Sequence, residues 1–183
     1  VLFRSVVTPR YQALYAVSAG KVANGTVKAN KTDAYGHLLN CGDELGADSV
    51  CTVYFDTTAT NVVLTATPSD PTKYRFLDFG SSSTCTGDGA AGGGATVGTC
   101  TFASLTADTA VVTPRYQALY AVSAGKVANG TVKANKTDAY GHLLNCSDEL
   151  GADSVCTVYF DTTATNVVLT ATPSDPTKYR FLD

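Results

Sequence analysis

The cysteines are the residues whose spacing most clearly predicts chemistry in this chain. They fall into three pairs that are close in sequence: Cys41 with Cys51, Cys146 with Cys156, and Cys85 with Cys100. Such pairs favour disulfides that each close a short loop, and disulfides are typical of an oxidising, extracellular setting. The alternatives are free thiols or a metal site. A metal site would combine His37 with the first pair, but it lacks the Cys-x-x-Cys spacing that zinc favours.

Other reactive side chains give weaker patterns. His37 and His142 have no nucleophile elbow near them, so the sequence does not predict a Ser-His-Asp hydrolase. The acidic segment 40–48 could hold calcium, but it lacks alternating Asp-x-Asp spacing and is better interpreted as a solvated loop. The glycine-rich segment 87–94 is not followed by the Lys-Ser/Thr of a phosphate-binding loop. We therefore expect no enzyme activity, no cofactor and no metal.

Asparagines in Asn-x-Ser/Thr sequons are candidates for modification. The possible glycosylation sites are Asn24, Asn30, Asn129, Asn135 and Asn145. Sequons also arise by chance in a Thr-rich chain, so these five asparagines are candidates only.

A long internal repeat dominates the organisation of the chain. Residues 6–78 recur as 111–183, at an offset of 105, and the only difference is Gly42, which becomes Ser147. Near-identity of this extent indicates recent duplication or selection for interchangeable units. Both suit a structural surface protein better than an enzyme. Residues 1–5 match the translation of a sequencing-adapter end, and we expect the chain to be a piece of a longer repetitive protein.

Composition and periodicity predict β-structure. Charged residues make up 16% of the chain and the net charge is −3, so we expect no nucleic-acid partner. No apolar run approaches the roughly 18 residues of a transmembrane helix, so we expect no membrane insertion. Period-two alternation, typical of half-buried strands, recurs without a convincing helical period. It occurs in segments 13–18, 26–30, 50–56, 61–67, 73–79, 100–105 and 110–116. In 50–56, Cys51, Val53 and Phe55 should share one face, and in 61–67 Val62, Leu64 and Ala66 should face inward.

Three segments resemble the divergent internalin B-repeat family of bacterial surface proteins. They read LLNCGDELGADSVCTVYF (38–55), NVVLTATPSDPTKYRFLDFG (61–80) and STCTG…GTCTFASL (83–105). The first cysteine pair is wider than the family pattern, and Phe79 stands where the family has Trp. The resemblance implies a small β domain carried in tandem on secreted or cell-surface proteins, and it implies no catalytic residues.

These observations predict an all-β chain of small disulfide-stapled β domains, sandwich-like or β-grasp-like, in tandem. In this interpretation 6–11 is the closing strand of a preceding repeat, 12–116 a complete domain, and 117–183 a second, incomplete domain. Residues of the closing strands should link neighbouring units: Val6, Val7, Thr8, Arg10, Tyr11, Val111, Val112, Thr113 and Tyr116.

The expected function is mechanical. We expect a structural subunit of an extracellular filament or surface stalk, self-assembling into a homopolymer or repeat array, joined head to tail by strand complementation. The alternative is an adhesin or carbohydrate-binding repeat on a cell-surface stalk. In that case glycans would be partners, and Tyr11, Tyr15, Tyr35 and Tyr54 could line a sugar platform.

Overall fold

The protein is all-β in a computed structural model that describes residues 9–80 and 97–180. The first part of the chain forms β1 (Leu14–Ser18), β2 (Gly25–Thr32), β3 (Leu38–Cys41), β4 (Thr52–Asp56), β5 (Thr60–Pro68), β6 (Tyr74–Asp78) and β7 (Gly98–Ser104). The second part forms β8 (Arg115–Ser123), β9 (Gly130–Thr137), β10 (Leu143–Cys146), β11 (Thr157–Asp161) and β12 (Leu169–Pro173). Val6, Val7, Thr8, Cys85 and the glycine-rich segment 87–94 lie outside the described residues.

The first unit, which we define as β1 to β7 plus residues 105–118, has a core between sheets. An antiparallel sheet in the order β3-β2-β5-β7 contributes to the same hydrophobic cluster as the β1–β4 pair. Val53 and Phe55 are buried, as the alternation in their segment predicts. Val62, Leu64 and Ala66 are fully buried on β5, which confirms the second predicted inward face. Phe79 completes this core and packs against Phe76.

Disulfides secure the same loop in both repeats. Cys41 bonds to Cys51, and Cys146 bonds to Cys156. The first bridge closes the segment that contains a short 3-10 helix, Asp43–Asp48, and the second closes the segment with its counterpart, Gly151–Asp153. A bridge across a short, weakly packed loop reduces the entropy that the loop gains on unfolding. Cys100 is buried on β7.

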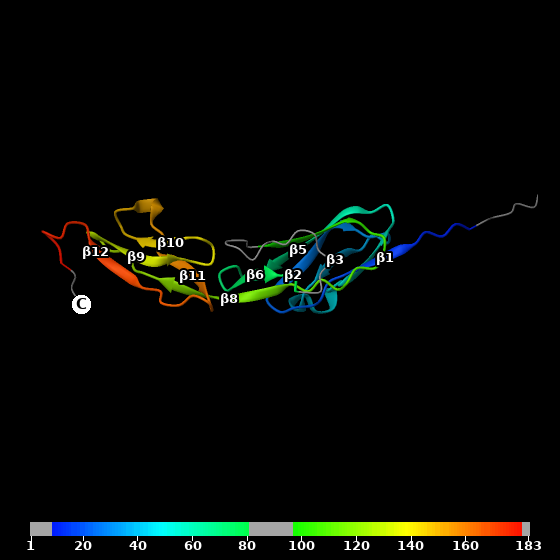
Figure 1. Ribbon diagram of the computed structural model, residues 1–183, viewed down its shortest axis with the longest axis horizontal. Coiled ribbons are helices and arrows are strands. Elements are labelled where there is room, and N and C mark those ends of the chain that lie inside the picture. Colours follow the sequence, from blue (N-terminus) through cyan, green and yellow to red (C-terminus); the bar gives the residue numbers. More distant parts are fainter. Residues whose placement is uncertain (1–8, 81–96, 181–183) are drawn as a thin grey trace, which may run out of the picture.

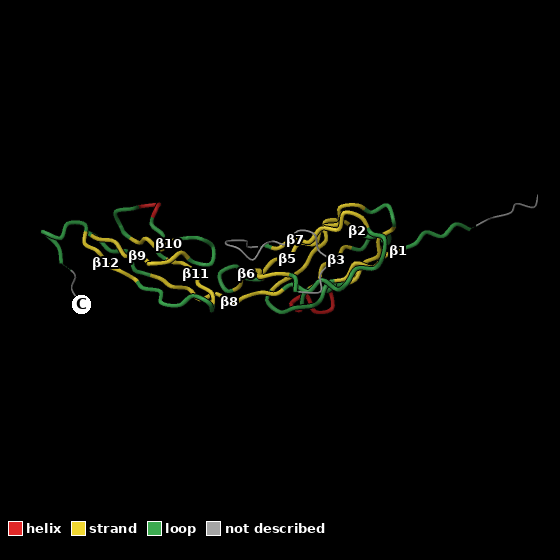
Figure 2. The backbone as a smooth tube through the Cα atoms, viewed as in Figure 1, coloured by secondary structure: helices red, strands yellow, loops and turns green. Residues whose placement is uncertain are grey.

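Strand β8 runs through both halves of the molecule. Figure 1 shows it extending from the neighbourhood of β6 to that of β11, and Figure 2 shows it as continuous strand. The sequence predicts a strand at 110–116, but the structure begins it at Arg115, because Pro114 has no N–H to give to a ladder. Before Pro114, Val112 makes only an isolated parallel bridge with Ala19.

The second unit, defined as residues 119–180, repeats most of the first with a smaller core. Its sheets are β10-β9-β12 and the pairing of β11 with the end of β8. Leu64 is fully buried because β7 pairs with β5, whereas its counterpart Leu169 is 39% exposed. Pairing also explains why Thr60–Val63 is strand while 165–168 is not, since no strand in the described part of the second unit occupies the position of β7. Among the described residues, no helix is long and apolar enough to cross a membrane.

Candidate inter-unit junction

The two units share one strand. Residues 115–118 of β8 pair with β6 of the first unit, where Tyr116 lies opposite Phe76 and Gln117 opposite Arg75. From Leu119 onward the same strand pairs with β11 of the second unit. Because the backbone hydrogen bonds pass from one partner to the other without a break, a cut between Tyr116 and Gln117 falls inside a strand.

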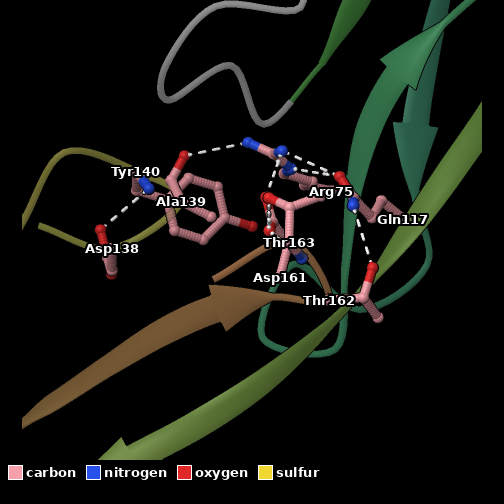
Figure 3. Close-up of polar contacts among 8 residues, drawn as sticks. All are labelled: Arg75, Gln117, Asp138, Ala139, Tyr140, Asp161, Thr162 and Thr163. Carbon is pink, nitrogen blue, oxygen red and sulfur yellow. Dashed lines mark hydrogen bonds and ion pairs between the residues drawn. The ribbon is translucent and has the colours of Figure 1, made fainter. Parts of the chain in front are cut away.

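Arg75 connects both units through its guanidinium group (Figure 3). Its Nη2 donates to the carboxylate of Asp161 at 2.5 Å and to the side-chain oxygen of Gln117 at 2.8 Å. Its Nη1 donates to the carbonyl oxygen of Ala139 at 3.4 Å. The side chains of Arg75 and Asp161 are only 20% and 9% exposed, so water screens this ion pair less than a surface pair.

The Asp161 carboxylate is held in its charged form. Partial burial favours the neutral acid, but hydrogen bonds from Thr163 and the positive charge of Arg75 outweigh it and lower the pKa of Asp161. Both Thr163 bonds, from the hydroxyl and the backbone N–H, reach the Oδ1 oxygen, which leaves Oδ2 for Arg75. The same aspartate therefore stabilises its own turn through Oδ1 and binds the neighbouring unit through Oδ2.

A second contact joins a tyrosine of the second unit to a turn of the first. The Tyr140 hydroxyl donates to the carbonyl oxygen of Pro71 at 2.6 Å. Asp138, whose side chain is fully buried, positions this loop by accepting the backbone N–H groups of Tyr140, His142 and Tyr159 at 2.8–2.9 Å. The contact with the first unit is thus made by a preformed loop.

The first unit carries the same loop in a more exposed setting. Asp33 accepts the backbone N–H groups of Tyr35, His37 and Tyr54, as Asp138 does in the second unit. Tyr35 is 64% exposed and Tyr54 is 45% exposed, while their counterparts in the second unit are half-buried. The same surface of the repeat is therefore partly covered at the junction and more exposed on the first unit.

Tyr116 anchors β8 to the first unit. Its hydroxyl lies 3.2 Å from the carbonyl oxygens of Thr26 and Thr67, which are acceptors for its proton. Its ring covers Gly25 so closely that a Cβ at that position would overlap the ring atoms, and it meets Phe76 edge to face. Burial raises the pKa of Tyr116 to about 12.

The residues predicted to form inter-unit strands occupy different environments. Val112 is fully buried in the first unit, and Tyr116 is half-buried on β8, whereas Val111 is 50% exposed. Arg10 and Tyr11 are exposed, with Tyr11 at 92%. The oxygen of the Thr113 side chain lies against Gly20.

The candidate glycosylation sites also differ. The Asn30 amide donates to the carbonyl of Asn61 and accepts the N–H of Val63, and Asn135 repeats both bonds. A glycan on either side chain would have to replace them. The Asn145 side-chain oxygen is buried. Asn24 and Asn129 lie in turns with positive φ and carry no such side-chain bonds among those described.

In the described part of the chain, no three His, Cys, Asp or Glu side chains lie close enough together to hold a metal ion.

The junction residues Arg75, Gln117, Tyr140 and Asp161 were not predicted from the sequence. The sequence shows only that each of these residues occurs in both repeats, and it does not show which of them contact one another.

No known family model, curated protein or solved structure matches this chain. Fold and junction define an all-β protein stabilised by disulfides.

Proposed function

We propose that this protein is a structural subunit of an extracellular filament or surface stalk in which near-identical β units are joined head to tail. The observation that carries the proposal is the shared strand: β8 completes a sheet in the first unit and begins one in the second. Load along the molecule would pass through this strand and its backbone hydrogen bonds. A flexible linker, in contrast, would leave the two units free to reorient.

The junction supports a rigid connection. The Arg75–Asp161 ion pair lies beside the shared strand, and the Tyr140–Pro71 hydrogen bond adds a further contact between the units. Side-chain contacts that supplement the strand would resist bending between the units. Because both halves of the junction recur in the sequence, the same geometry can repeat from unit to unit. A repeated contact that does not close on itself produces a linear array.

The disulfides support an extracellular location, because such bonds persist in oxidising compartments. An adhesin is the second candidate, favoured by the exposed Tyr35 and Tyr54 rings, which lie edge to face at 6.5 Å. The counterparts of these rings are half-buried in the second unit. In an array, this surface would therefore be accessible only on the first unit of the array.

NMR relaxation of the intact chain at low concentration tests the proposal. We expect the amides of both units to report one common, anisotropic tumbling time. Two independent tumbling times would contradict a rigid structural unit. Binding of the monomer to a glycan array, lost on Tyr35→Ala, would favour the adhesin instead.

A further inference from the structure

Both halves of the internal junction occur a second time among the described residues. Arg180 and Pro176 are the counterparts of Arg75 and Pro71, and they lie exposed at the end of the second unit. Asp56 and Tyr35, the counterparts of Asp161 and Tyr140, lie on the first unit. Each of the two surfaces that contact one another at the internal junction therefore occurs once more in the described structure, where it does not contact its counterpart.

The end of the second unit has a cavity where the first unit has Tyr116. The cavity is about 350 Å³ and its lining includes Gly130, Thr131, Thr172, Pro173 and Tyr179. In the first unit the Tyr116 ring covers Gly25, whereas the atoms nearest to the corresponding position of Gly130 are backbone atoms of Thr172 and Pro173. The two carbonyl groups that would accept from a tyrosine here, those of Thr131 and Thr172, belong to residues that line the cavity.

The start of the chain supplies a segment of matching sequence. Residues 9–13 read Pro-Arg-Tyr-Gln-Ala and are identical to residues 114–118, which pack against β6 and Gly25 of the first unit. Figure 1 shows this segment, in dark blue, leading away from β1. Tyr11 is 92% exposed, although the same side chain at position 116 is half-buried and hydrogen-bonded.

We infer that these two unpartnered surfaces bind each other between separate molecules of this chain. Residues 9–13 of one molecule dock on the second unit of the next, with Tyr11 in the cavity beside Gly130. Arg180 of the receiving molecule then binds Asp56 and Gln12 of the donor, as Arg75 binds Asp161 and Gln117 within one chain. Tyr35 of the donor meets the turn at Pro176.

Docking of this kind places a side-chain anchor in a pocket, a recurring way of recognising an extended segment. The donor and acceptor surfaces are different and lie at opposite ends of the molecule (Figure 1), so association does not close at a dimer. This inference rests on the proposed function, because it extends the head-to-tail junction from units within a chain to separate molecules.

A complementation experiment with two exposed-residue variants tests the inference. Tyr11→Ala removes the donor anchor and leaves the acceptor intact, whereas Arg180→Glu opposes Asp56 and leaves the donor intact. Analytical ultracentrifugation should show concentration-dependent oligomers for the wild-type chain, and at least about tenfold weaker association for each variant alone. An equimolar mixture of the variants should form dimers that grow no further, because only one productive junction is available.

Unchanged melting temperatures and intact disulfides would verify that both variants fold. Wild-type chain that stays monomeric at every soluble concentration would overturn the inference, as would Tyr11→Ala protein that assembles as well as wild type. Neither result touches the rigidity of the internal junction, which NMR relaxation of the monomer measures separately. Independent tumbling of the two units, in contrast, would refute the proposed function even if molecules associate.

Discussion

Arg75 of the first unit and Asp161 of the second bind each other across 86 residues of sequence, with both side chains largely removed from water. The same guanidinium also binds Gln117 on the strand that the two units share. A single side chain thus ties β6, β8 and the end of β11 together. We expect this arrangement to restrict the angle between the units, because a single shared strand could still twist.

Arg75→Ala should loosen the junction without unfolding either unit. The substitution leaves the Asp161 carboxylate partly buried without its charged donor, so the contact between units should weaken by roughly 2 kcal/mol. Separate tumbling times for the two units in NMR relaxation would report the change. Arg180→Ala is the matched control, since it removes the same side chain where it is exposed. Equal effects of both variants at low concentration would contradict this role.

Tyr116→Ala should destabilise the first unit, because the ring fills the space above Gly25 and its hydroxyl bonds two strands. Removal of a packed aromatic ring costs about 3 kcal/mol or more. Tyr11→Ala removes the same side chain from an exposed position and should leave the free energy of unfolding of the monomer unchanged. Chemical denaturation of the two variants measures the difference, and a similar loss in both would show that Tyr116 is not an anchor.

Period-two alternation was enough to predict the all-β class and the buried faces of β4 and β5, since a strand with one buried side repeats every second residue. Strand β3 was missed because its four residues are too few to show the pattern. The junction could not be predicted either. Arg75 and Asp161 are far apart in sequence, and charged residues in a single sequence resemble an ordinary solvated surface.

The first unit should lose stability at high pH through Tyr116. The unfolded chain releases this proton near pH 10.0 and the folded chain near 12. Between these values the unfolded state binds fewer protons, so stability falls as pH rises, while below pH 10 the contribution of the neutral hydroxyl is fully present. Absorbance at 295 nm should show a late phenolate step that Tyr116→Phe removes. A step unchanged in that variant would assign the high pKa to another tyrosine.

The matched disulfides Cys41–Cys51 and Cys146–Cys156 allow the stability of the units to be compared at equivalent positions. Each closes a loop between cysteines ten residues apart, so replacing either pair by alanine should cost about 3 kcal/mol on the chain-entropy model. The second unit has the smaller core, with Leu169 exposed where Leu64 is buried. Loss of Cys146–Cys156 should therefore produce a separate, early thermal transition, whereas loss of Cys41–Cys51 should lower the main transition. Calorimetry distinguishes these two outcomes. An early, separate transition after loss of Cys41–Cys51 instead of Cys146–Cys156 would show that burial in the core does not set the relative stability of the units.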